Sequence, residues 1–235
     1  MSALFFLKKF QVYTIIMYNK KIRLLCFMNV GETMKTCYIF SAVEMKSNFP
    51  SPSGDDLIIA ADAGYLNVQR AGLKPDVIIG DFDSSEKPDT DTPIKTFPVL
   101  KDDTDTMLAI KYGFNNGYKR FAIYGGLGGE RTDHTIANIQ SLAYIVDHGG
   151  EGFLVGEKET FALIKNSSIT LRSEKGKTLS VFAYGGIAEG ISIKGAVYET
   201  DNLALSPFFP LGVSNKFNAS SATVGVKSGC LLIKW

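Results

Sequence analysis

The sequence predicts an α/β fold in which a mostly parallel sheet covered by helices is followed by a smaller antiparallel β-sandwich. Between Met34 and about Lys165, short apolar runs alternate with helical patterns, which is typical of a parallel sheet. After about Asn166, short segments with period-two alternation, separated by glycines, are typical of a sandwich. The chain has 235 residues, of which 45% are hydrophobic, and can bury a core in each region. We predict a Rossmann-like domain over 34–165 and a β-sandwich domain over 166–235.

The α/β region contains six predicted strands and two predicted helices. The strands are short apolar runs at Thr36–Phe40, Leu57–Ala61, Val77–Gly80, Ile94–Phe97, Phe121–Tyr124 and Gly152–Val155. One helix is predicted from about Thr104 to Asn115, where apolar residues recur with a period of about 3.6. A second helix begins near Asp133 and ends at the glycine pair Gly149-Gly150.

The carboxyl-terminal region contains six further predicted strands. They are Ser168–Arg172, Thr178–Ala183, Ile187–Ile193, Val197–Thr200, Ser220–Val226 and Leu231–Trp235. Glycines separate most of these segments, and their spacing favours antiparallel hairpins.

Charge is distributed unevenly along the chain. Residues 1–35 carry a net charge of +5, whereas residues 36–235 carry −4. A mildly negative body without a basic stripe disfavours nucleic-acid binding. The apolar runs of the first 33 residues are interrupted by Lys and Arg, are too short to span a bilayer, and precede no Ala-x-Ala cleavage site. We therefore expect no membrane anchor. Because Met34 directly precedes the first strand, we expect residues 1–33 to be a disordered extension or to lie upstream of the true start.

The three cysteines, Cys26, Cys37 and Cys230, are widely spaced and form no Cys-x-x-Cys motif. Neither a disulfide framework nor a structural zinc site is indicated. A reducing cytoplasm is the compartment that fits this pattern best.

Acidic residues follow the predicted strands of the α/β region. They are Asp62, the pair Asp81 and Asp83, Asp105, and Asp133 at the end of a glycine-rich loop. Because the carboxyl ends of parallel strands meet at one edge of a sheet, these carboxylates are expected to converge there. Clustered carboxylates without Cys or His favour Mg²⁺, which usually binds together with substrate phosphates.

The loop Gly125–Gly129 leads into the second predicted helix, where backbone N–H groups and the helix dipole favour an anion. Arg131 can pair with a phosphate. The loop matches neither the Gly-x-Gly-x-x-Gly dinucleotide motif nor the lysine-containing P-loop. Some polar residues near these motifs fit ordinary structural roles: Asp102 or Asp103 is expected to cap the first helix, and His134 fits a packed first-turn residue better than a base.

Taken in order, four motifs resemble the thiamin pyrophosphokinase family. They are Ala61-Asp62-Ala63-Gly64, the segment 75–84 with Asp81-Phe82-Asp83, the segment 101–105, and the segment 125–134 with Asn138. The likeness continues into the β region at Gly195-Ala196-Val197-Tyr198 and Val213-Ser214-Asn215. Two departures are an Ala63 where the family usually has glycine and an additional Glu130 before Arg131, while residues 1–33 have no counterpart.

The resemblance implies Mg²⁺-dependent transfer of pyrophosphate from ATP to thiamin, giving thiamin diphosphate and AMP. It implies that Asp81, Asp83 and Asp105 hold the metal and that Asp133 supports the metal and nucleotide or orients the thiamin hydroxyl. ATP would contact Asp62, Gly64, Thr104, Gly128, Gly129, Arg131, His134 and Asn138, and thiamin would contact Tyr198, Ser214 and Asn215. The resemblance also implies a homodimer whose thiamin site is shared between subunits.

Two other functions are compatible with parts of the pattern. Asp81-Phe82-Asp83 also resembles the Asp-x-Asp motif of metal-dependent glycosyltransferases. A non-enzymatic nucleotide- or thiamin-binding protein is the second alternative, although binding alone does not require so many clustered carboxylates.

Overall fold

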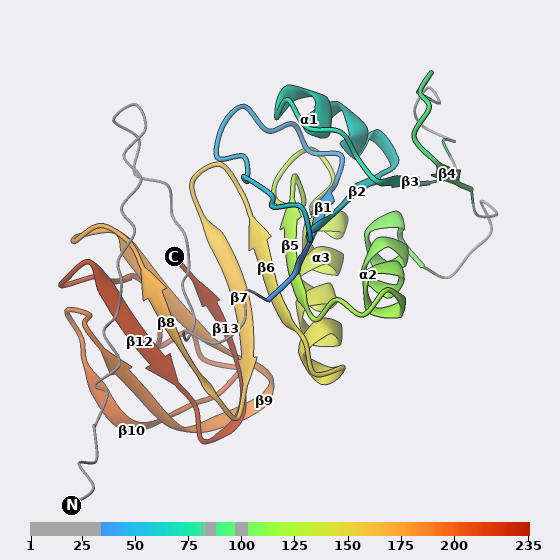
Figure 1. The fold of residues 1–235 in the computed structure, drawn as a ribbon. Coiled ribbons are helices and arrows are strands. Elements are labelled where there is room, and N and C mark those ends of the chain that lie inside the picture. Colours follow the sequence, from blue (N-terminus) through green and yellow to red (C-terminus); the bar gives the residue numbers. More distant parts are fainter. Residues whose placement is uncertain (1–33, 81, 83–87, 97–102) are drawn as a thin grey trace, which may run out of the picture.

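The computed structural model describes residues 34–80, 82, 88–96 and 103–235, and its first half is built on a parallel sheet (Figure 1). The strands are β1 (Thr36–Phe40), β2 (Leu57–Ala61), β3 (Val77–Ile79), β4 (Ile94–Lys95), β5 (Arg120–Tyr124) and β6 (Glu151–Val155). They lie in the order β4-β3-β2-β1-β5-β6, and all five pairings are parallel. All six predicted strands are confirmed, with bounds that differ by at most two residues, although Phe97, the predicted end of β4, lies outside the described residues.

Helices cover both faces of the parallel sheet. On one face, α2 (Asp105–Asn115) and α3 (Thr132–Asp147) pack through Ile110 and Leu142 against Ile39 and Ile123 of the sheet. On the other face, the short helix α1 (Tyr65–Arg70), which follows the 3₁₀ turn η1 (Asp62–Gly64), packs through Val68. Both predicted helices are confirmed. Helix α1 was not predicted because six residues are too few to show helical periodicity.

The second half of the chain is antiparallel. Its strands are β7 (Thr160–Lys165), β8 (Ser168–Arg172), β9 (Thr178–Lys194), β10 (Thr200–Leu205), β11 (Asn215–Lys216), β12 (Ser221–Gly225) and β13 (Ser228–Lys234). The path continues from β6 through β7-β13-β9-β12-β8, and β10 and β11 also pair with β9. These strands enclose their own buried core, which includes Leu171, Ile191, Phe217 and Leu231. The predicted fold class is therefore confirmed.

Three strand predictions in this half differ from the structure. The segments Thr178–Ala183 and Ile187–Ile193 form one strand, β9, because pairing with β13, β12 and β10 carries the chain through the intervening glycines. Of the predicted strand Val197–Thr200, only Thr200 belongs to a strand, as the first residue of β10, while residues 197–199 form a bend before it. Strand β7 was not predicted from the sequence. What establishes this short apolar run as a strand is its pairing with β6 and β13, which only the folded structure shows.

Candidate active site

The carboxyl ends of β1, β2, β3 and β5 lie side by side at one edge of the sheet. The register pairs Phe40 with Ala60 and with Tyr124, and it pairs Ala61 with Ile79. The residues that follow these strands therefore line the same edge, as the strand order predicts. Asp81 and Asp83, which follow β3, lie outside the described residues.

Asp62 stands directly after β2 in a tight turn. Its φ of 49° places a non-glycine residue in the left-handed region, which is uncommon and concentrates at functional sites. A Cβ at Gly64 would lie 1.9 Å from the carbonyl oxygen of Phe40, so only glycine lets η1 approach the end of β1 this closely. A Cβ at Gly80 would lie 3.1 Å from the Cα of Asp62, which places the ends of β2 and β3 in contact.

The glycine loop, Gly125–Gly129, joins β5 to the segment before α3. Its Gly125, Gly128 and Gly129 have φ values of 66°, 76° and 75°. A Cβ at Gly125 would lie 2.6 Å from the carbonyl oxygens of both Ser41 and Val43, so glycine is needed for space as well as for conformation.

Two side chains of α3 shape the glycine loop. The Thr135 hydroxyl accepts a hydrogen bond from the backbone N–H of Gly128 at 3.1 Å. The buried Asn138 donates its amide N–H to the carbonyl oxygen of Gly126 at 2.9 Å. Asn138 therefore stabilises the conformation of the glycine loop through this hydrogen bond. A direct contact between Asn138 and ATP stays a prediction. Thr135 was not predicted as a site residue; its position in the first turn after the loop was the available signal.

Arg131 and Asp133 form an exposed ion pair at the start of α3. The guanidinium Nη2 lies 2.9 Å from a carboxylate oxygen of Asp133, and both side chains are about two-thirds exposed. The hydrogen bond from Arg131 holds the pKa of the Asp133 carboxyl below its usual value. An exposed pair of this kind contributes little stability, so a phosphate could replace the carboxylate as the partner of Arg131 at small cost. His134, which we expected from the sequence to be packed in this first turn, is instead exposed.

The start of α2 corrects one prediction. The N-cap is Thr104, whose hydroxyl accepts a hydrogen bond from the N–H of Met107 at 3.2 Å. Asp103 instead accepts hydrogen bonds from the ammonium group of Lys111 at both carboxylate oxygens, at 2.8 and 2.7 Å. Asp102, the other predicted cap, lies outside the described residues.

Asp105, a predicted metal ligand, occupies the first turn of α2 and is partly exposed. The next residue, Thr106, is buried, and its hydroxyl lies 2.9 Å from the hydroxyl of Ser41 after β1. This contact fixes the start of α2 against the carboxyl edge, so Asp105 lies close to the strand ends. Within the residues described, no group of three or more His, Cys, Asp or Glu side chains is placed to hold a metal. Of the three predicted metal ligands, only Asp105 belongs to that part of the chain.

The predicted thiamin residues form a separate cluster in the β region. The buried Asn215 accepts a hydrogen bond from the N–H of Tyr198 at 3.0 Å and donates one to the carbonyl oxygen of Tyr198 at 2.8 Å. The Tyr198 side chain remains 73% exposed. Ser214 has a φ of 64°, and its N–H donates to the Ser180 hydroxyl at 3.1 Å. The structure therefore brings Tyr198 and Asn215 together, and Asn215 fixes the backbone of Tyr198.

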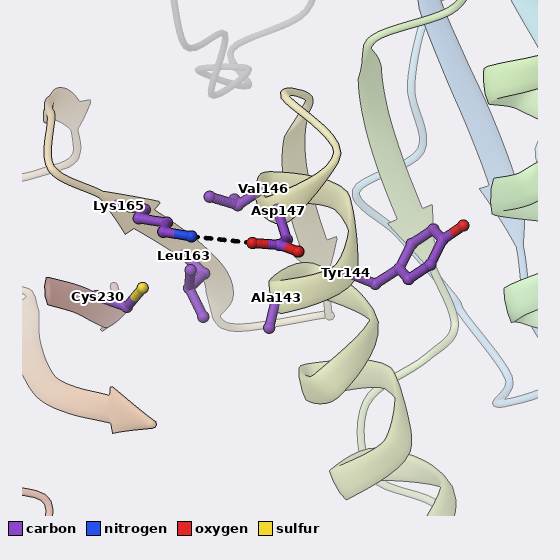
Figure 2. A pocket seen from close by; sticks show the side chains of 7 residues that line it. All are labelled: Ala143, Tyr144, Val146, Asp147, Leu163, Lys165 and Cys230. Atoms are coloured by element: carbon purple, nitrogen blue, oxygen red, sulfur yellow. Dashed lines mark hydrogen bonds and ion pairs between the residues drawn. The ribbon is translucent and has the colours of Figure 1, made fainter. Parts of the chain in front are cut away.

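A cavity of about 320 Å³ lies away from the carboxyl edge, beside the carboxyl-terminal end of α3 (Figure 2). Its lining includes Ala143, Leu163 and Cys230 together with Lys165 and Asp147, whose side chains form an ion pair at 2.9 Å. The two charges neutralise each other, and the other walls are largely apolar. We therefore do not assign the predicted chemistry to this cavity.

No helix in the described part of the chain is both long enough and apolar enough to cross a membrane.

Two family models match the chain in sequence. The model described as "Thiamin pyrophosphokinase, catalytic domain" matches residues 52–153, and "Thiamin pyrophosphokinase, vitamin B1 binding domain" matches residues 166–231. The chain is 25% identical over 184 residues to a protein of Bacillus subtilis (strain 168) named thiamine pyrophosphokinase, covering 75% of this chain and 86% of that protein.

Solved structures show the same fold. A thiamine pyrophosphokinase from Bacillus subtilis superposes with a TM-score of 0.76 at 22% identity, covering 85% of this chain and 98% of the other. A yeast thiamin pyrophosphokinase gives a TM-score of 0.66 at 17% identity, with 87% of each chain covered. The glycosyltransferase and the non-enzymatic alternatives receive no support from these comparisons. The chain is an enzyme of the thiamin pyrophosphokinase family.

Proposed function

We propose that this protein transfers the pyrophosphoryl group of ATP to the hydroxyethyl group of thiamin, forming thiamin diphosphate and AMP. The observation that carries the proposal is the carboxyl edge, where the turn at Asp62 and the glycine loop Gly125–Gly129 meet the ends of adjacent strands. Backbone N–H groups of the glycine loop and of the start of α3 suit phosphate oxygens. The family membership is our reason for proposing ATP and thiamin as the two substrates of this site.

ATP binds along this edge in our proposal. Asp62, Gly64 and Thr104 lie on the side of β2 and α2, and Gly128, Gly129, Arg131, His134 and Asn138 lie on the side of α3. Arg131 leaves its exposed pair with Asp133 to bind the phosphates, and Asp133 then supports the metal and nucleotide or orients the thiamin hydroxyl. Because the reaction displaces AMP from phosphorus, catalysis consists mainly of positioning and of charge neutralisation.

The acidic residues that follow the strands in sequence are hard oxygen donors of the kind that Mg²⁺ prefers. Asp81, Asp83 and Asp105 are the residues proposed to hold the ion. When bound, Mg²⁺ neutralises the charge of the transferring phosphates. Support comes from Asp105, which the contact between Thr106 and Ser41 fixes near the strand ends.

Thiamin is proposed to bind at Tyr198, Ser214 and Asn215, with a homodimer completing the site. A flat, positively charged thiazolium suits an aromatic face, and Tyr198 offers one that is 73% exposed. Around the same loops, Phe208 is 94% exposed, and Phe209, Leu211 and Val213 are also exposed. Adjacent exposed apolar side chains of this kind favour an interface, here with a second copy of the chain.

We propose that the α/β domain over 34–165 binds the nucleotide and that the β-sandwich domain over 166–235 binds thiamin. We also propose a cytoplasmic location. It is supported by the two described cysteines, Cys37 and Cys230, which are both free thiols.

The activity is tested by incubating the full chain with ATP, Mg²⁺ and thiamin and by measuring AMP and thiamin diphosphate. Asp81→Asn and Asp83→Asn should each abolish turnover without unfolding the protein, because they remove charge and hardly change volume. Full turnover of both variants at limiting Mg²⁺ would contradict the metal assignment. Absence of AMP and thiamin diphosphate from the wild-type reaction would overturn the proposed function.

The shared thiamin site is tested by mixing two inactive variants. Asp81→Asn and Tyr198→Ala place their defects in different domains, so a mixed dimer would contain one intact site. Equal amounts that exchange subunits freely should recover about a quarter of the wild-type activity. No recovery despite subunit exchange, or a fully active monomer at nanomolar concentration, would overturn the shared site.

A further inference from the structure

The hairpin between β6 and β7 forms hydrogen bonds with residues 46–48, in the segment that follows β1. The carboxylate of Glu157, in the hairpin turn, accepts hydrogen bonds from the N–H of Lys46 at 2.5 Å and the N–H of Ser47 at 2.9 Å. Its second oxygen accepts a bond from the Ser47 hydroxyl at 2.5 Å. The amide of Asn48 adds a fourth bond, to the carbonyl oxygen of Gly156 at 3.0 Å. One carboxylate thus holds two consecutive residues of a segment more than 100 positions away in sequence.

The same segment lies against the glycine loop. The N–H of Val43 donates to the carbonyl oxygen of Gly125 at 2.9 Å. A Cβ at Gly129 would lie 3.0 Å from a methyl carbon of Val43, so the loop backbone rests on that side chain. A shift of residues 43–47 would therefore move Val43 relative to the backbone of the glycine loop and displace that loop.

The hairpin also contacts the glycine loop directly. A Cβ at Gly156 would lie 3.1 Å from Cδ1 of Leu127, which places the hairpin backbone against the middle of the loop. On the opposite side, the segment after β1 is held by the buried Asn67 of α1, which donates to the carbonyl oxygens of Ser41 and Val43 at 2.8 Å each. The segment is thus fixed at two points, by α1 and by the hairpin.

We propose that Glu157 is a positioning residue that holds the glycine loop in its nucleotide-binding shape by clamping residues 46 and 47. The inference rests on the proposed binding of ATP at this loop. Glu157 itself lies in the turn of the hairpin and acts only through the segment after β1. Hydrogen bonds to an ionised acceptor are stronger than neutral ones, so three of them on one carboxylate suit a clamp at the protein surface.

Three variants test the clamp. Glu157→Ala removes all three bonds. Glu157→Gln keeps an oxygen that can accept from both backbone N–H groups. Glu159→Ala is the matched control, because Glu159 belongs to the same hairpin but pairs with Lys234 of β13, with its carboxylate 3.3 Å from the ammonium nitrogen. All three are made in the full chain, and thermal unfolding is recorded for each.

The first readout is hydrogen–deuterium exchange of the backbone amides in the peptide that covers residues 125–129. Glu157→Ala should speed this exchange by at least about tenfold, because it removes three charge-assisted hydrogen bonds and the loss of one alone corresponds to about that factor. Glu159→Ala should remain within about twofold of the wild type, and Glu157→Gln, which keeps an acceptor for the two backbone N–H groups without its charge, should fall between the wild type and Glu157→Ala. Exchange in Glu157→Ala equal to that of Glu159→Ala would overturn the proposal. This readout does not depend on catalytic activity.

The second readout is steady-state kinetics. Glu157→Ala should raise KM for ATP by about tenfold while KM for thiamin stays unchanged, since only the nucleotide loop is displaced. A lower melting temperature with unchanged loop exchange and unchanged KM for ATP would mean a merely structural role and would reject the clamp. If the wild type forms no AMP from ATP and thiamin, the proposed function fails, whereas the exchange measurement still decides whether Glu157 holds the loop.

Discussion

Asn215→Asp should weaken the proposed thiamin site because it replaces one atom, the side-chain amide nitrogen, with an oxygen. The side-chain oxygen of Asn215 accepts from the N–H of Tyr198 at 3.0 Å and of Lys216 at 2.8 Å, and an aspartate keeps an oxygen there. The amide nitrogen, however, donates to the carbonyl oxygen of Tyr198 at 2.8 Å. In the variant two acceptor oxygens face each other at this place.

The expected loss of stability follows from burial. Asn215 is only 8% exposed, so water cannot readily replace the lost donor. Leaving a buried acceptor unsatisfied costs about 1–3 kcal/mol, and each kcal/mol lowers the melting temperature of a chain of this size by roughly 2–4 °C. We therefore expect Asn215→Asp to melt roughly 2–12 °C below the wild type at pH 7, measured by calorimetry.

The pH dependence distinguishes this cause from a general packing defect. Only the protonated aspartate can donate to the Tyr198 carbonyl, so the folded state should raise the pKa of the new carboxyl above its value of about 3.9 in the unfolded chain. The stability difference from the wild type should then shrink as the pH falls through the raised pKa. A constant difference from pH 7 to pH 4 would refute the reasoning.

The functional consequence concerns Tyr198, whose backbone Asn215 holds. Asn215→Asp should raise KM for thiamin by about tenfold and leave KM for ATP unchanged. Asn218→Asp is the matched control, because Asn218 is exposed near the same strand, and it should change stability by less than about 0.5 kcal/mol. Equal effects of the two substitutions would contradict the assignment.

Three further changes test other parts of the structure. Gly64→Ala should lower the melting temperature by roughly 2–12 °C, because overpacking against the backbone of β1 costs about 1–3 kcal/mol, whereas Gly54→Ala, with nothing within 4 Å of the added Cβ, should have little effect. Thr104→Ala should cost about 1 kcal/mol by removing the cap of α2, and Asp103→Asn, which weakens only a surface ion pair, should cost less; the reverse order in chemical denaturation would contradict the structural assignment. Burial raises the pKa of the Glu157 carboxyl, but hydrogen bonds from Ser47 and Lys46 outweigh it and hold the pKa below its ordinary value of 4.5, so the stability that the carboxylate contributes is present at neutral pH and lost as the pH falls below 4.5. The melting-temperature difference between the wild type and Glu157→Gln should therefore shrink in acid, and a difference that grows there would contradict this sign.

Most of the α/β region could be predicted from the sequence because its signals are local. The strand Leu57–Ala61 is an uninterrupted apolar run that ends at Asp62, and α3 ends where Gly149 allows the chain to turn. The common edge of the strand ends followed from one rule about parallel strands. That rule assigned Asp62 and the glycine loop to the same edge without any knowledge of side-chain contacts.

The contacts that the sequence could not predict are long-range. Asp103 was expected to cap α2, but Thr104 fills that position, and only the folded helix brings Lys111 within reach of Asp103. Asn67 gives a weak signal, a polar residue on the buried side of a short helix, but its partners lie more than 20 residues away. Glu157 gives no signal at all, because an acidic residue in a hairpin turn is ordinary until residues 46 and 47 are seen beside it.

The hairpin that carries Glu157 also stands where the two halves of the fold join. Strand β6 belongs to the parallel sheet, while β7 pairs with β13 of the antiparallel half. At the hairpin, Thr160 and Trp235 exchange backbone hydrogen bonds at 2.8 and 3.0 Å, so the last strand of the chain holds the turn in place. Because Glu157 then fixes the segment that supports the glycine loop, the phosphate-side loop takes part of its support from the domain proposed to bind thiamin. A rigid connection of this kind fixes the nucleotide side of each subunit relative to its own β half, so a homodimer joined through the β halves would hold ATP of one subunit opposite the thiamin residues of its partner, as a reaction that depends on positioning requires.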